Sequence, residues 1–224
     1  MPSPGAVSLA LPFRGPWQAR NSPARRVPSH GTRLFATTYA IDFVAVQGRR
    51  TAATRDWRTL LSTEPPERFV AFGQPILAPA AGTVVSVLDG EADHEARRSQ
   101  VALVPYALTQ AGRIRGGPAA IAGNHVVLEL TDGVFVLLAH LRRGSVSVAP
   151  GRRVAEGEQL GECGNSGNST QPHVHLQVMD AADAARASGL PLEFRSYRVR
   201  PRSGGAPVAV ARGVPGESEV VEPV

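Results

Sequence analysis

The chain has 224 residues, of which 42% are hydrophobic, 19% charged and 5% aromatic. This length suits one domain with extensions and is sufficient to bury a core. The single cysteine, Cys163, excludes an intramolecular disulfide framework and a Cys-rich zinc module. No apolar run reaches the roughly 18–20 residues of a membrane-spanning helix. The first twelve residues lack the basic segment of a secretory signal, so we expect none.

All 24 residues in the Lys+Arg count are arginine, and the formal net charge is +5. The arginines are spread along the chain in pairs, such as Arg25-Arg26 and Arg142-Arg143, rather than gathered in one block. A nucleic-acid-binding protein typically shows a clustered basic stripe or a recognisable motif. We therefore expect no nucleic-acid partner.

Short strands between Gly/Pro turns dominate the pattern. Runs of apolar and β-branched residues predict strands at Tyr39–Val44, Val84–Leu88, His125–Leu130, Val134–Leu138 and Val174–Val178. Asp132-Gly133 favours a tight hairpin between two of them. Only Ala181–Ser188 favours a helix, ended by Gly189. The sequence therefore predicts an all-β fold with loop insertions and few short helices.

Composition divides the chain into three parts. Residues 1–20 form a lead-in, and residues 21–200 form the main domain, with insertions near 51–67 and 89–117. Residues 201–224 are rich in Gly, Pro and Val and form a C-terminal extension, either a peripheral hairpin or a loose tail.

The densest local signal is a Gly/Asn/Ser-rich loop that leads into His173-Val-His175. On a strand, alternation points both imidazoles to one face. Two such imidazoles can form half of a metal site. They can equally be two surface histidines on an amphipathic strand, and the pair alone leaves both readings open.

Three further residues favour the metal site. Asp42 lies within an otherwise apolar strand, where a carboxylate is costly unless it is paired or bound to a metal. His30 lies upstream, and His140 ends an apolar strand beside a turn, where a sheet can present a general base. Two histidines and one aspartate leave the fourth tetrahedral position of a zinc ion open to water.

These pieces together resemble the LytM/lysostaphin-type zinc endopeptidases, which cut peptidoglycan cross-bridges. The resemblance runs from about Pro12 to Arg200. It rests, in the family's order, on His30 and Asp42, Ala78–Val84, Gly123–Val127, Ala139–Leu141, Val154–Gly161 and Gly164–His175. It implies an antiparallel β-sheet core of the barrel-sandwich-hybrid or β-roll type.

The resemblance also implies roles for individual residues. One Zn²⁺ per chain would be bound by His30, Asp42 and His175. His140 and His173 would stand at its open side as catalytic residues, activating water or stabilising the oxyanion. Many members of the family space the first histidine and the aspartate four apart, whereas here they are twelve apart. We expect a loop or hairpin to close this longer link.

The remaining candidates are less direct. His125 and Asn124 are candidate cleft residues at the start of an apolar strand. His94 lies in a polar insertion, and we expect a solvated surface side chain. Cys163, just before the histidine loop, is expected to be a small buried filler rather than a nucleophile.

The sequence thus predicts a zinc-dependent metalloendopeptidase that hydrolyses peptide bonds, in peptidoglycan cross-links or stem peptides or else in another peptide substrate. The alternative is a catalytically silent relative that binds the cell wall or activates another hydrolase. Biotinyl and lipoyl carriers, which have a similar fold, need an acceptor lysine and are excluded because the chain has none. The resemblance implies the cell envelope or the extracellular space, and the sequence leaves the oligomeric state open.

Overall fold

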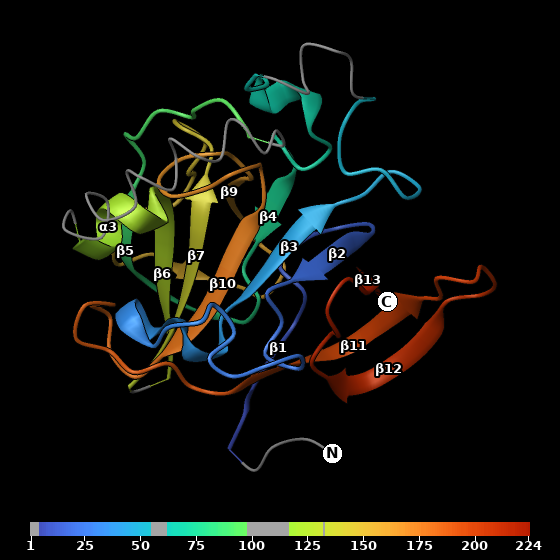
Figure 1. Ribbon diagram of the computed structural model, residues 1–224. Coiled ribbons are helices and arrows are strands. Elements are labelled where there is room, and N and C mark those ends of the chain that lie inside the picture. Colours follow the sequence, from blue (N-terminus) through green and yellow to red (C-terminus); the bar gives the residue numbers. More distant parts are fainter. Residues whose placement is uncertain (1–4, 55–61, 98–116, 132) are drawn as a thin grey trace.

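A computed structural model describes residues 5–54, 62–97, 117–131 and 133–224 (Figure 1). Parts of the insertions predicted near 51–67 and 89–117, and Asp132 of the predicted hairpin, lie outside these residues. Within them the chain is built mainly from strands, with few and short helical segments, which confirms the predicted all-β class. The main sheet is large and does not close on itself. None of the described helices is long and apolar enough to cross a membrane.

The elements follow the chain in a simple order. The strands are β1 (Val7–Leu9), β2 (Trp17–Arg20), β3 (Ile41–Ala45), β4 (Pro75–Leu77), β5 (Gly82–Leu88), β6 (Asn124–Thr131), β7 (Val134–Leu141), β8 (Arg153–Val154), β9 (Gln159–Glu162), β10 (Val174–Met179), β11 (Leu192–Arg200), β12 (Val208–Gly213) and β13 (Val220–Pro223). The helical segments are two 3₁₀ turns, η1 (Leu34–Tyr39) and η2 (Pro66–Arg68), and one short α-helix, α3 (Gly117–Ala122).

The five strands predicted from the sequence correspond to β3, β5, β6, β7 and β10, which form the middle of the main sheet. Its pairs are antiparallel except for β1 and β11, which run parallel. A separate two-stranded sheet pairs β4 with β9. In the C-terminal extension, β12 and β13 both pair with β11, so this segment is structured and extends the sheet rather than forming a loose tail. The division at residues 20 and 200 remains a prediction.

One face of the sheet carries the main hydrophobic core. Because side chains alternate along a strand, the odd residues of β3 and the even residues of β10 point to this face. Its largest fully buried side chains are four aromatic residues joined by successive ring contacts, Trp17, Phe13, Phe43 and Phe194. The opposite face carries Asp42, His175 and a smaller apolar cluster that includes Leu137 and Ala139. The functional candidates thus lie on the face turned away from the main core.

The prediction of a helix over Ala181–Ser188 was wrong. These residues form bends and turns. The side chain of Asp183 accepts a hydrogen bond from the backbone N–H of Ala185, and that of Asp180 accepts one from Ser188. Aspartate side chains compete in this way with the backbone bonds of a helix, and the segment is too short for propensity alone to prevail.

The aromatic cluster predicts where stability resides. The side chain of Phe194 is fully buried, and its ring packs edge-to-face on Phe43 at 5.4 Å between centroids. We expect Phe194→Ala to lower the free energy of unfolding by about 3–5 kcal/mol, measured by denaturant unfolding. Val208→Ala on β12, where the side chain is 57% exposed, serves as the control and should change it by less than about 0.5 kcal/mol. A small effect of the Phe194 change would contradict this account of the core.

Candidate active site

The sheet register brings Asp42 and His175 together. They are direct partners across β3 and β10, and the Nδ1 atom of His175 lies 2.8 Å from a carboxylate oxygen of Asp42. Residues 31–40, which include η1, loop back so that Nε2 of His30 lies 3.2 Å from the same carboxylate. Candidate ligand atoms of these three residues lie within 4.8 Å of one another. The twelve-residue spacing is therefore closed by a loop, as expected.

Hydrogen bonds on the outer side of His175 determine which of its ring nitrogens carries a proton. The amide nitrogen of Gln177 donates to the backbone carbonyl of Phe35 at 2.8 Å, which turns its oxygen toward His175. That oxygen lies 2.9 Å from Nε2 of His175 and can only accept. Nε2 therefore carries a proton, and Nδ1, on the inner side, is left to bind a cation.

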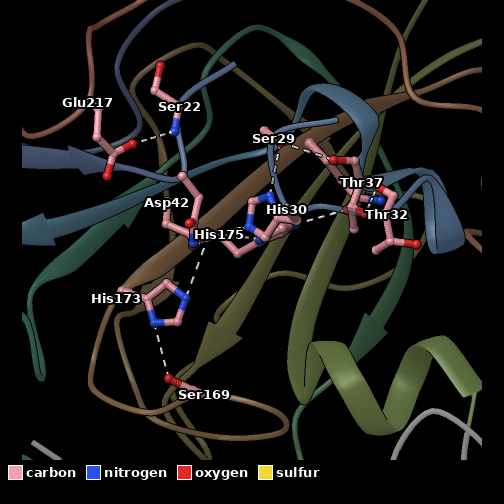
Figure 2. Close-up of polar contacts among 12 residues, drawn as sticks. Ser22, Ser29, His30, Thr32, Thr37, Asp42, Ser169, His173, His175 and Glu217 are labelled. Carbon is pink, nitrogen blue, oxygen red and sulfur yellow. Dashed lines mark hydrogen bonds and ion pairs between the residues drawn. The ribbon is translucent and has the colours of Figure 1, made fainter. Parts of the chain in front are cut away.

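The same reasoning applies to His30. The hydroxyl of Ser29 donates its one proton to the carbonyl of Thr37, so toward Nδ1 of His30, 3.0 Å away, it accepts (Figure 2). Nδ1 of His30 therefore carries a proton. The inner nitrogens, Nε2 of His30 and Nδ1 of His175, both face Asp42; a proton on either donates to the carboxylate, and a bound cation would take the place of that proton. The second oxygen of Asp42 accepts a hydrogen bond from the side-chain amide of Asn21 at 2.7 Å, which fixes the orientation of the carboxylate.

Electrostatics agree with this arrangement. Burial would raise the pKa of Asp42, but nearby His30 and His173, together with hydrogen bonds from His175 and His30, hold it well below its usual value. Burial would lower the pKa of His175, but its hydrogen bond to Asp42 and the charge of Asp42 raise it. Two imidazole nitrogens and a carboxylate converge on one point, and this donor set fits a divalent metal that accepts nitrogen and oxygen ligands.

His140 reaches the same face through a β-bulge. Between β6 and β7, Asn124 pairs with Leu141 but His125 pairs with Ala139, so His140 is an extra residue with no pairing partner on β6. Its backbone has φ of 62°, in the left-handed region that non-glycine residues rarely adopt. Regular alternation would place His140 beside Leu138, in the main core. The bulge instead turns its side chain toward the site.

His140 and His173 form a pair beside the cluster. Their ring centroids are 4.6 Å apart, and Nε2 of His173 lies 3.7 Å from Asp42 (Figure 2). Nδ1 of His140 donates to the carbonyl of Ser166, and Nδ1 of His173 donates to that of Gln171. Each Nε2 is therefore left as an acceptor. Burial lowers the pKa of both histidines, so both rings are neutral at neutral pH.

These side chains line a cleft of about 270 Å³. All five predicted metal and catalytic residues contribute to it: His30, Asp42, His140, His173 and His175. Of the two predicted cleft residues, His125 lines an adjoining cavity of about 340 Å³ and is bound through Nδ1 to the carbonyl of Gly123. Burial lowers the pKa of His125. Asn124 is fully buried behind the bulge, where its side chain bonds to the backbone of Glu91 and Leu141.

The segment after β5 braces the loop that carries His173. One carboxylate oxygen of Asp93 accepts the backbone N–H of Asn165, and the other accepts that of Arg143. His94 is partly buried, and its Nε2 lies 2.9 Å from the carbonyl of Gly167. The expectation that His94 is a solvated surface residue was therefore wrong. Its polar surroundings in the sequence gave no indication that Asp93 and His94 pack against the histidine loop.

Backbone close contacts set the position of the same loop. Gly123 and Gly167 have φ of 60° and 67°, and a Cβ at either would lie about 2.5 Å from backbone atoms of the other's segment. Cys163 precedes the loop and is completely buried, as expected of a filler. Burial raises the pKa of its thiol well above the usual value, so it is a poor nucleophile.

The residue-based predictions missed the side chains that orient the ligands. Gln177 was detectable, because it lies two residues after His175 and alternation places both on one face. Asn21 and Ser29 reach the site only through loop geometry, and no sequence pattern marks them.

Residues 106–187 match the family model described as Peptidase family M23. The matched segment contains His140, His173 and His175, and ends before the C-terminal strands. The match confirms the resemblance to LytM/lysostaphin-type peptidases and the class of enzyme that it implies, a metalloendopeptidase.

Solved structures give the same family names at low similarity. A variant catalytic domain of the prophage-encoded M23 protein EnpA from Enterococcus faecalis is 18% identical, with a TM-score of 0.40 over 68% of this chain and 73% of that one. The catalytic domain of the antimicrobial peptidase lysostaphin from Staphylococcus simulans is 20% identical, with a TM-score of 0.38 over 67% and 74%. The M23 metalloprotease pseudoalterin, described as from the deep sea, is 13% identical, with a TM-score of 0.44 over 87% and 82%. These values are too low to transfer a substrate to this chain.

The bracing role of Asp93 can be measured directly. We expect Asp93→Ala to speed hydrogen exchange at the amides of Asn165 and Arg143, because both lose their acceptor. We also expect it to lower the free energy of unfolding by about 1–3 kcal/mol. Asp93→Asn keeps one of the two acceptor oxygens and should give an intermediate effect. Unchanged exchange at both amides would contradict the role.

Proposed function

We propose that this chain, which carries the family M23 match over residues 106–187, is a zinc-dependent endopeptidase acting on peptidoglycan cross-links or stem peptides. The observation that carries the proposal is the convergence of Nε2 of His30, the carboxylate of Asp42 and Nδ1 of His175, each held by an outer hydrogen bond. Peptidoglycan lies outside the cytoplasmic membrane, so the proposal includes a location in the envelope or outside the cell.

The proposed metal ligands are His30, Asp42 and His175, and one Zn²⁺ per chain suits this set of two imidazoles and one carboxylate. When bound, zinc supplies a Lewis acid that polarises a peptide carbonyl and makes water more acidic at neutral pH. The protein's own contribution is to orient the three donors. Gln177 and Ser29 fix the ring nitrogens that carry protons, and Asn21 fixes the carboxylate.

His140 and His173 are proposed to move protons. Each ring is neutral, is anchored through Nδ1–H to a backbone carbonyl, and has a free Nε2 acceptor. One Nε2 can take a proton from the attacking water, and a protonated imidazole can return it to the amine that leaves. A protonated imidazole can also donate a hydrogen bond to the oxyanion. Both rings are largely buried, which strengthens both interactions.

The first test is the release of soluble fragments from purified peptidoglycan by the purified full chain with added zinc. We expect release that a chelator abolishes and that zinc restores. Asp42→Ala should lose both bound zinc and activity. His140→Ala should keep zinc but lose about 10²–10⁴-fold in rate, because it removes a proton-transfer group and none of the proposed metal ligands. Fragment masses identify the bond.

Glu67→Ala, which removes an exposed carboxylate in η2, is the matched control and should behave as the wild type. One bound zinc per chain with no cleavage of peptidoglycan or of a peptide library would support the silent, wall-binding alternative. Absence of both zinc binding and cleavage would overturn the proposal.

A second test addresses the residue that orients His175. Gln177→Met removes the acceptor for Nε2–H, so the ring can adopt the other tautomer or rotate. We expect the affinity for zinc to fall about 10–100-fold, measured by competition with a chromophoric chelator. Gln177→Glu keeps an acceptor at the same place and should lie closer to the wild type. Equal affinities for Gln177→Met and the wild type would contradict the orienting role.

A further inference from the structure

The floor of the cleft continues beyond the histidine cluster. Sheet register places Asp42 opposite His175, His175 opposite Ala139, and Ala139 opposite His125, across the four adjacent strands β3, β10, β7 and β6. Adjacent strands lie about 4.8 Å apart. This row therefore extends roughly 10 Å past His175 along the direction in which an extended peptide would cross the sheet.

The side chains that form the floor change from polar to alkyl between β10 and β7. A second row on the same face lies beside the first: in it Gln177 pairs with Leu137, and Leu137 pairs with Val127. On β3 and β10 the floor is therefore carboxylate, imidazole and amide, whereas on β7 and β6 it is mainly alkyl until His125. Of the described isoleucines, only Ile121 lies in the wall above this alkyl floor.

The walls confirm that this is one groove. The cavity beside the cluster, about 270 Å³, and the cavity at His125, about 340 Å³, share four lining residues, Pro118, Ala122, Leu137 and Ala184. Ala122 belongs to α3, and Ala184 belongs to the turn after β10. Ala184 and Leu137 are 7% and 5% exposed, whereas Ile121 on α3 is only partly buried. The apolar surface that stays accessible in this groove therefore belongs to its walls, including Ile121, rather than to its floor.

We propose that this stretch, lined by Ile121, Leu137 and Ala184, is a specificity pocket for an aliphatic side chain of the peptide residue next to the cleaved bond. The inference rests on the proposed function and refines its substrate class. An aliphatic side chain covers the exposed alkyl surface, whereas glycine leaves it in contact with water. The preferred peptide is thus one with an alanine- or leucine-like residue beside the cleaved bond rather than a Gly-Gly pair.

The test measures binding, so that it does not depend on turnover. Short peptides with a reduced, uncleavable bond carry leucine on one side of it, leucine on the other side, or glycine on both. They are titrated into the zinc-supplied full chain labelled at isoleucine methyl groups. We expect one leucine peptide to bind roughly tenfold or more tightly than the glycine peptide and to shift the Ile121 methyl signal. Ile41 and Ile76 are fully buried in the main core and serve as unshifted references.

A pair of variants locates the pocket. Ala184→Leu fills it and should remove the preference for leucine while leaving glycine-peptide binding within about threefold. Ala185→Leu makes the same change at an exposed neighbouring side chain and should keep the preference. If Ala184→Leu does not fold, the wild-type titration still decides.

Equal affinity for leucine and glycine peptides, or an unmoved Ile121 methyl, would overturn the pocket. So would a preference that survives Ala184→Leu. Cleavage of ordinary peptides is measured alongside. Cleavage with no preference leaves the proposed function standing and refutes the pocket. Selective binding of the leucine peptide with no cleavage of the matching ordinary peptide supports the pocket and refutes the proposed function.

Discussion

The site depends on a negative charge held inside a sheet. Asp42 is 6% exposed and lies between Ile41 and Phe43, which are fully buried on the other face. A carboxylate in this place is tolerated only if cationic or hydrogen-bonding groups surround it. Those groups come from separate parts of the chain: Asn21 after β2, His30 before η1, His173 just before β10, and His175 on β10. The need to compensate one charge thus fixes how these segments meet.

The site also requires the bulge at His140, because regular alternation along β7 would not bring this side chain to the site. A regular β7 would send the side chain at position 140 into the main core, among leucines, and away from His173. The strained backbone at this residue is held from both sides. Asn124 bonds to the backbone of Leu141, and Ser166 accepts from the His140 ring while its hydroxyl also bonds to Leu141. Strain of this kind persists where the surroundings over-determine the conformation.

This contrast explains how much the sequence predicts. Runs of apolar residues identified the central strands and the cost of Asp42, and period-two alternation predicted a common face for His173 and His175. It could not reveal the bulge, which breaks that period by one residue. Nor could it place His30, whose approach depends on the path of residues 31–40. Asn21 and Asp93 act through loops, and the turn at Ala181–Ser188 is set by two aspartate side chains that outcompete a short helix. Local sequence patterns predict strands and turns, whereas contacts between loops can be known only from the tertiary structure.

The two faces of the sheet carry separate physical tasks. The face with Phe43 and Phe194 buries large side chains and supplies most of the hydrophobic stabilisation. The other face collects a buried charge, four imidazoles, a strained bulge and small side chains that leave a groove open, all of which cost stability or fail to add it. Because a strand separates its faces at every residue, a substitution on the groove side, such as one at Gln177, can alter the groove without touching the aromatic core. A single β-sheet can therefore hold a rigid core on one side and a costly, chemically active arrangement only one side chain away.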